Sequence, residues 1–439
     1  MNYFPSVIRA VVWLTVIAVA IRAGMLLVYQ PITFQDTGTY HTLASQLLAF
    51  DFRDYRGQRT PGYSVILLLA GQDHFIVWLM QSAMGVLVSL LLFGICFVHT
   101  HNAVWSFFAG LCHSLALNQV IFEANMLSET FNTLIIVLSV ACLVSALKSD
   151  PRPRFGVAAG FALALATLTR PVCIYMGPIF VVLVLLFERN RKRLAAGLGA
   201  AFLVPVLGWA VFNKVTINYF GLTTLVGYNL TNHSGAFMEK AGDQYATIRD
   251  IYLNYREKRF EQGKSHRFTI FDARDEMLEK TGLDEIGLSR QLTKLSLELF
   301  VSHPLLYLRG VAEAWASFWL PAIYMDKDKF KMPSAAKVIA AIWPVERIAI
   351  LMLNFIAIAV SGWVLVRAAL QRCKGISGLS IPLIVTCVIM AASVLQALVE
   401  FGENPRYGVP TQSLALTLVL LAAWDIRSHF RGRSAAAKR

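Results

Sequence analysis

The stretch VIRAVVWLTVIAVAIRAGMLLVY, residues 7–29, sets the class of the fold because it is one apolar run of bilayer length. A helix needs about 20 such residues to cross the hydrocarbon core of a membrane. The run is too long, and its flanks are wrong, for a cleaved signal peptide. Residues 7–29 therefore predict a membrane-spanning helix.

Comparable apolar runs recur along the 439-residue chain, which is 56% hydrophobic and 15% charged. Ordinary soluble domains are about 25% charged. We therefore predict an all-α, polytopic membrane helical bundle of about ten spans. The spans are expected at residues 7–29, 75–98, 103–121, 126–147, 155–170, 172–187, 194–216, 344–369, 378–399 and 408–427.

The net charge of +13 would suggest a nucleic-acid partner in a soluble protein. Here most of the excess falls in short loops, and in the tail from residue 427, that share one side if the N-terminus is inside. This positive-inside pattern predicts a multi-pass protein of the bacterial inner membrane with no nucleic-acid partner. The loop cations are Arg152, Arg154, Arg189, Arg191, Lys192, Arg193, Arg372 and Lys374.

The six cysteines fall in predicted spans or at a cytoplasmic edge, so we expect no disulfide. The histidines are scattered without the spacing of metal ligands. The sequence therefore predicts no metal site and no cofactor, although assistance by a divalent cation stays open.

The polar residues between spans divide the chain. Residues 303–321 could be taken for a further span, but Arg309 and Glu313 interrupt them, and a span here would invert the basic loops downstream. We expect an amphipathic helix on the outer surface instead. The predicted parts are 1–217, an N-terminal module with the outer loop 30–74; 218–302, a polar outer segment; 303–342, the interfacial helix and loop; and 343–439, a C-terminal module with a basic tail.

With this topology, acids and arginines from separate segments of the chain gather at the outer face. Charged groups at membrane depth are costly and tend to be functional. The first outer loop, FQDTGTYHTLASQLLAFDFRDYRGQRTPGYS at residues 34–64, is the longest polar run near the start of the chain. The gathered residues are Asp36, Arg59, Glu129, Arg170, Glu403, Arg406 and Tyr407.

Each of these groups also has a purely structural explanation. Asp36 could cap the helix that follows it, and residues 128–129 could be a capping pair. Glu403 and Arg406 could form a simple i,i+3 ion pair, and Arg170 could extend its side chain toward the interface. These local explanations do not account for the gathering of such groups on one face.

An acid and several arginines at the outer face suit the transfer of a sugar from a polyprenyl-phosphate lipid. The phosphate is already a good leaving group and needs cationic partners, for which guanidinium is well shaped. The acceptor hydroxyl is a poor nucleophile, so a carboxylate must take its proton. The apolar helices would hold the lipid tail.

The same residues resemble the membrane glycosyltransferases of the GT-C superfamily, nearest to the protein O-mannosyltransferase-like and aminoarabinose-transferase-like families. The resemblance covers mainly the first 215 residues and the last outer turn. It is carried by Asp36 with Tyr40 and Ala44, Arg59-Thr-Pro-Gly-Tyr63, Leu127-Ser-Glu129, Leu168-Thr-Arg170-Pro171, and Glu403-Asn-Pro-Arg406-Tyr407-x-x-Pro410.

This resemblance implies an inverting glycosyltransferase with Asp36 as catalytic base, a polyprenyl-phosphate sugar donor, and a hydroxyl acceptor on a lipid, glycan or protein. Many relatives place an Asp-Glu pair where this chain has Gln35-Asp36-Thr37. A second acid would then have to come from Glu129 or Glu403. The implied substrate contacts are Tyr40, Arg59, Tyr63, Glu129, Arg170, Glu403, Arg406 and Tyr407.

Three other functions remain open at this point. An O-antigen ligase or polymerase would need essential arginine and histidine residues in a large outer loop. A flippase or transporter of lipid-linked sugars would place charges in mid-membrane rather than at one face. A scaffold protein with fortuitous capping acids would need neither.

Overall fold

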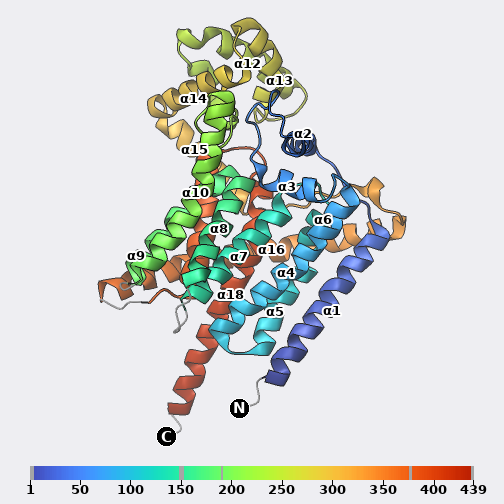
Figure 1. Ribbon diagram of the computed structural model, residues 1–439, viewed down its shortest axis with the longest axis vertical. Coiled ribbons are helices and arrows are strands. Elements are labelled where there is room, and N and C mark those ends of the chain that lie inside the picture. The colour runs from blue at the N-terminus through green and yellow to red at the C-terminus, as the bar shows by residue number, and fades with distance from the viewer. Residues whose placement is uncertain (1–3, 148–152, 189–190, 375–377, 437–439) are drawn as a thin grey trace.

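The computed structural model describes residues 4–147, 153–188, 191–374 and 378–436 of the chain. Within them every regular element is a helix (Figure 1). The elements that pack in the apolar bundle are α1 (Phe4–Val28), α3 (Pro61–Leu69), α4 (His74–Thr100), α5 (Ala103–Leu115), α6 (Leu117–Glu123), α7 (Glu129–Ala146), α8 (Pro153–Thr169), η1 (Pro171–Tyr175), α9 (Met176–Phe187), α10 (Lys192–Ile217), α16 (Pro333–Cys373), α17 (Ile381–Val399) and α18 (Asn404–Ala436).

Among the described residues, seven helices are long and apolar enough to cross a membrane, or eight if α5 and α6 count as one bent span. The seven are α1, α4, α7, α10, α16, α17 and α18. The apolar helices α8 and η1–α9 are shorter. Each predicted span therefore coincides with a helix or helix pair, and the all-α, multi-span class is confirmed. The predicted number, about ten, exceeds the seven or eight that helix length supports.

The span predicted at residues 103–121 is a bent pair of helices rather than one continuous helix. The helix is interrupted at Ala116, and α5 and α6 meet there at an angle of 57°. No glycine or proline marks this break in the sequence. The Leu117 N–H that the break frees donates to Glu346 Oε1 of α16 at 2.8 Å. A partner from another helix thus supplies the bond that lipid cannot give.

The start of α1 and the end of α18 lie at one end of the bundle, and α12, α13 and α14 lie at the other (Figure 1). Helix ends predicted to face the cytoplasm are joined to one another. Arg191 Nη1 donates to the carbonyl of Ala146 at 2.7 Å, and the Gly378 N–H donates to the carbonyl of Phe187 at 2.9 Å. The predicted loop cations Arg152 and Arg189 lie outside the described residues.

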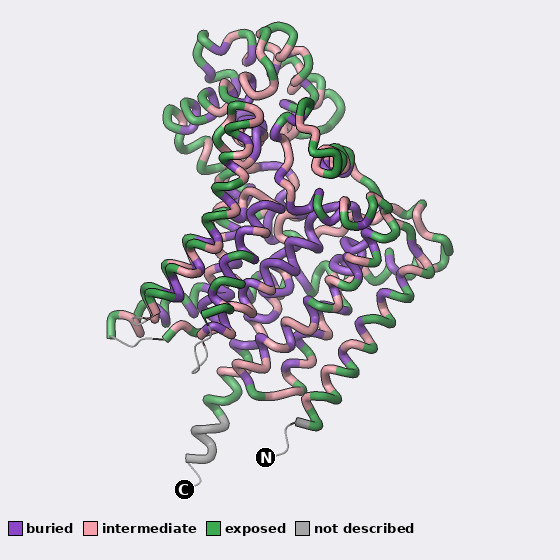
Figure 2. The backbone as a smooth tube through the Cα atoms, in the orientation of Figure 1, coloured by how far each residue is buried: buried purple, intermediate pink, exposed green. Residues whose placement is uncertain are grey.

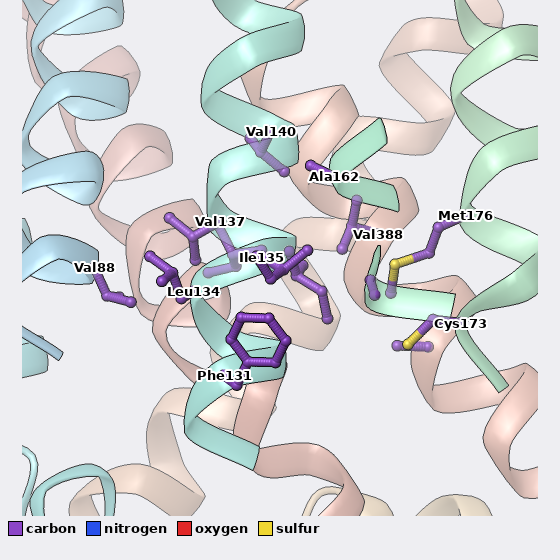
Figure 3. Close-up of a cluster of buried hydrophobic side chains, with 14 of the residues drawn as sticks. Val88, Phe131, Leu134, Ile135, Val137, Val140, Ala162, Cys173, Met176 and Val388 are labelled. Atoms are coloured by element: carbon purple, nitrogen blue, oxygen red, sulfur yellow. The ribbon is translucent and has the colours of Figure 1, made fainter. Parts of the chain in front are cut away.

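Helix α7 forms the centre of the bundle. Its side chains Phe131, Leu134 and Val137 are buried among residues of α4, α8, α9 and α17 (Figure 3). The buried part of the backbone runs through this region and thins out toward the outer segment (Figure 2). A helix buried on every side is apolar all round, so the polar Glu129 at its first position stands out.

The outer segment forms a small helical unit of its own. Its apolar core includes Tyr228, Tyr252, Met277 and Leu292. The elements are α11 (Val226–Ser234), η2 (Gly235–Lys240), η3 (Asp243–Tyr245), α12 (Ala246–Glu261), α13 (Thr269–Thr281) and α14 (Glu285–Ser302).

Helix α15 (Pro304–Phe318) follows where the interfacial helix is predicted, and η4 (Lys327–Lys329) lies in the loop after it. Arg309 pairs with Glu313 on the exposed side of α15. Tyr307 donates to the carbonyl of Leu398 at 2.7 Å, which ties α15 to the end of α17. The helix therefore connects the outer segment to the bundle.

A buried ion pair that the sequence analysis did not single out lies inside the bundle. Arg22 of α1 donates from Nη2 and Nε to the two carboxylate oxygens of Glu123, at 2.6 and 3.1 Å. Both side chains are at most 3% exposed. A Cβ on Gly85 would lie 1.9 Å from Glu123 Oε1, so only glycine leaves room for the pair.

Candidate active site at the outer end of the bundle

Hydrogen bonds between the start of α2 and the residues just before α7 fix the position of Asp36. It lies in the first turn of α2 (Gln35–Ala49), whose N-cap is Phe34. Thr37 Oγ1 accepts the Phe34 N–H at 2.8 Å and donates to the carbonyl of Met126 at 2.9 Å. The side chain of Asp36 makes no cap bond, so the capping explanation is wrong. Its carboxylate is free for other partners.

Two arginines from distant segments hold that carboxylate. Arg59 Nη2 donates to Asp36 Oδ1 at 2.6 Å, and Arg406 Nη2 donates to Oδ2 at 3.1 Å. Burial alone would raise the pKa of Asp36, but the charges of Arg59 and Arg406 outweigh it and lower the pKa below its ordinary value. The carboxylate of Asp36 is therefore ionised at neutral pH. One-third of its side chain is exposed, so a substrate can reach it.

The first outer loop also fixes Arg59. Its Nε donates to Thr39 Oγ1 at 2.8 Å, and its guanidinium carbon lies 4.6 Å from the centre of the Tyr40 ring. Tyr63 packs edge-on behind Tyr40 at 5.0 Å between ring centres. Tyr40 thus borders the site directly. Tyr63 is 0% exposed and supports Tyr40 from below.

Arg406 is bonded to three carboxylates at once. Besides Asp36, its Nε donates to Glu129 Oε1 at 2.5 Å and its Nη1 donates to Glu403 Oε2 at 2.6 Å. The i,i+3 pair of Glu403 and Arg406 therefore exists, but as one of three links. Because these acids come from the start of α2, the start of α7 and the last outer turn, Arg406 joins all three segments.

Glu129 is completely buried and accepts a second bond, from Arg170 Nη1 at 2.7 Å. Ser128, the N-cap of α7, makes no side-chain cap bond, so the capping-pair explanation is wrong. Arg170 is only 13% exposed and lies 4.9 Å above the ring of Tyr407. It points into the site rather than toward the interface. Among the described residues, Glu129 Oε2 has no partner.

Sequence reasoning missed Glu400, at the end of α17. Its Oε1 accepts the hydroxyl of Tyr407 at 2.5 Å. Burial raises the pKa of Glu400, with the Tyr407 bond and the charges of Arg170 and Arg406 acting against this rise. The turn from Glu400 to Glu403 carries two acids, and that spacing was the available signal.

The structure thus brings together eight of the nine predicted site residues and sets Tyr63 one layer behind them. Four carboxylates and three guanidinium groups form one connected network. Among the described residues, no three His, Cys, Asp or Glu side chains are grouped so that they could hold a metal ion.

The comparisons with known proteins agree with this architecture. Residues 63–211 match the family described as dolichyl-phosphate-mannose-protein mannosyltransferase. The matched segment contains Glu129 and Arg170 but not Asp36 or Arg406. No curated protein matches the chain.

Solved structures are similar over nearly the whole chain. The oligosaccharyltransferase AglB from Archaeoglobus fulgidus, in complex with an inhibitory peptide and a dolichol-phosphate, has a TM-score of 0.50 and 15% identity, covering 99% of this chain and 52% of that one. ArnT from Cupriavidus metallidurans, bound to undecaprenyl phosphate, has a TM-score of 0.43 and 13% identity, covering 95% of this chain and 77% of that one. The chain thus spans about half the length of AglB.

These findings define an all-helical chain with seven or eight candidate membrane spans among its described residues and with a fold similar to that of AglB. The match of residues 63–211 to the dolichyl-phosphate-mannose-protein mannosyltransferase family confirms the resemblance that the sequence motifs indicated.

Proposed function

We propose that the protein is an inverting glycosyltransferase, which moves a sugar from a polyprenyl-phosphate donor to a hydroxyl acceptor at the outer face of the membrane. The observation that carries this proposal is the Asp36 carboxylate, partly exposed and bonded to both Arg59 and Arg406. The description of the matched family, which names a dolichyl-phosphate-linked mannose, supports the class of donor.

In the proposed reaction, the acceptor oxygen attacks the anomeric carbon while Asp36 takes the hydroxyl proton. The bond from the anomeric carbon to the phosphate oxygen breaks, and its electron pair leaves with the polyprenyl phosphate. A single displacement inverts the anomeric configuration without a covalent intermediate. Base assistance of this kind typically contributes about 10²–10⁴-fold to the rate.

The arginines assist this step by binding the leaving phosphate. A guanidinium has five N–H donors, and Arg406 uses three of them on carboxylates. Its remaining donors, and those of Arg170, are available to a phosphate. As Arg406 turns toward the leaving phosphate, its hold on Asp36 weakens and the pKa of Asp36 rises, which makes Asp36 a stronger base when the acceptor is deprotonated.

The test is an in vitro transfer assay with the purified protein and synthetic polyprenyl-phosphate sugars. We expect Asp36→Asn to fold normally and to lose transfer by at least about 10²-fold. Asp51→Asn is the matched control, because Asp51 lies in the same loop and, among the described residues, pairs only with the exposed Arg53. Transfer that survives Asp36→Asn would disprove the base assignment.

One observation favours a transporter of lipid-linked sugars as the second candidate. The Arg22–Glu123 pair places charge inside the bundle, as a transporter would require. The pair is closed, because both oxygens of Glu123 are bonded to Arg22. Movement of the donor between leaflets of a reconstituted vesicle, without transfer to any acceptor, would favour this candidate.

A further inference from the structure

We propose that the outer segment, residues 218–302, sets the position of Glu403 and Arg406 by packing around Phe401, which lies two positions before Glu403. This inference rests on the proposed function for the chemistry of the site. The residues that pack around Phe401 have a positioning role, not a catalytic one. The Phe401 clamp consists of His233, His266 and Arg267.

The clamp surrounds an aromatic ring that is 6% exposed. The ring of His233 is stacked on that of Phe401, with 5.4 Å between centres and 26° between planes. The guanidinium carbon of Arg267 lies 5.0 Å from the Phe401 ring centre, and the ring of His266 lies 5.9 Å from it. A guanidinium over an aromatic face is attracted by the ring quadrupole. Phe401 is thus held by several groups of the outer segment, and it also packs with Ala314 of α15 and Ala397 of α17.

The clamp is also bonded to the backbone on both sides of Phe401. His233 Nε2 donates to the carbonyl of Ala397 at 2.8 Å, and Arg267 Nη1 donates to the carbonyl of Gly402 at 3.3 Å. A Cβ on Gly402 would lie 3.0 Å from Phe268 Cζ, so the turn passes close under the outer segment. The outer segment therefore contacts both the side chain and the backbone of this turn.

The turn connects the clamp to the site through short links. The side chain of Asn404 accepts the Gly402 N–H and donates to the carbonyl of Glu400, both at 3.0 Å, which makes the turn rigid. Arg406 lies in the first turn of α18, directly after it. A displacement of Phe401 therefore moves the guanidinium that bridges Asp36, Glu129 and Glu403. A misplacement of about 1 Å can cost about 10²-fold in rate.

The competing explanation is that the Phe401 clamp only attaches the outer segment to the bundle. Loss of such an attachment would lower thermal stability but would not change the ionisation of Asp36, which faces Arg59 and Arg406. Positioning predicts that loss of the clamp withdraws Arg406 from Asp36. The acid limb of the pH profile of kcat/KM then moves to higher pH, since the pKa of Asp36 returns toward its ordinary value.

The experiment compares purified, full-length Arg267→Ala, Arg267→Lys and wild-type protein. We expect Arg267→Ala to lower kcat by roughly 10- to 100-fold, with little change in the KM for a polyprenyl-phosphate sugar and with the acid limb shifted upward. Arg267→Lys keeps a cation over Phe401 and should recover much of kcat. Arg290→Ala is the control, because Arg290 is an exposed arginine of the same segment that donates to the carbonyl of Asn218.

Hydrogen–deuterium exchange gives a readout that does not depend on activity. We expect faster exchange of the backbone amides of residues 400–408 in Arg267→Ala than in wild type. Unchanged exchange would overturn the clamp, and faster exchange with unchanged kcat and acid limb would overturn its positioning role. If wild type transfers no sugar while exchange still rises in Arg267→Ala, the proposed function fails and the clamp stands. If Arg267→Ala does not fold, His233→Asn, which loses the stacked imidazole, takes its place in both measurements.

Discussion

Arg406 Nη2 lies 3.1 Å from Asp36 Oδ2, although 370 positions separate the two residues in the sequence. This contact joins the first outer loop to the last outer turn across the top of the bundle. It also makes the ionisation of Asp36 depend on a residue at the far end of the chain. The consequences can be measured.

Replacement of Arg406 by Gln should move the acid limb of kcat/KM to higher pH. The pKa of Asp36 is lowered in the folded protein, so its charged form is favoured above that pKa and lost as the pH falls through it. Removing Arg406 takes away one of the two cations that lower it, and the pKa rises. The measurement is a pH–rate profile. Arg406→Lys should not restore wild-type rates, because an ammonium cannot reproduce the fork that reaches three carboxylates. An unshifted acid limb would show that Arg406 does not control Asp36.

Replacement of Glu129 by Ala should destabilise the protein far more than replacement of Glu403 by Ala. Glu129 is fully buried between Arg170 and Arg406, whereas the side chain of Glu403 is one-third exposed. Removing one partner of a buried ion pair leaves an uncompensated charge and costs about 3–5 kcal/mol. Partly exposed pairs contribute roughly 0–1 kcal/mol. Thermal unfolding in detergent compares the two variants, and equal losses would contradict the buried network.

The pair of Arg22 and Glu123 predicts a non-additive effect on stability. Arg22→Met alone should destabilise by about 3–5 kcal/mol, because Glu123 then stays buried without a partner. Arg22→Met combined with Glu123→Met should recover much of that loss, since two apolar side chains of similar volume replace the pair. Additive losses in a double-mutant cycle would indicate that the two residues are not coupled.

The sequence predicted the class of the fold because bilayer-length apolar runs are a direct physical signal. It also indicated most of the charged residues that the structure brings together at one end of the bundle, since charged groups at membrane depth are costly to keep without a role. It could not predict the break at Ala116, where the freed Leu117 amide is paired by Glu346 from a helix far along the chain. It also missed Glu400, whose partner Tyr407 lies across a turn. Both depend on tertiary partners that periodicity does not reveal.

The predicted orientation in the membrane can be tested with two positions that the structure leaves exposed. Arg53, in the first outer loop, has a side chain that is 88% exposed, and the native Cys373, at the end of α16, is also exposed. If the N-terminus is inside, these positions face opposite sides of the membrane. A membrane-impermeant maleimide should then label Arg53→Cys in intact cells and Cys373 only after permeabilisation. Cys373→Ser removes the second signal and serves as the control. Labelling of Cys373 in intact cells, or protection of position 53, would invert the topology and place Asp36 on the cytoplasmic side.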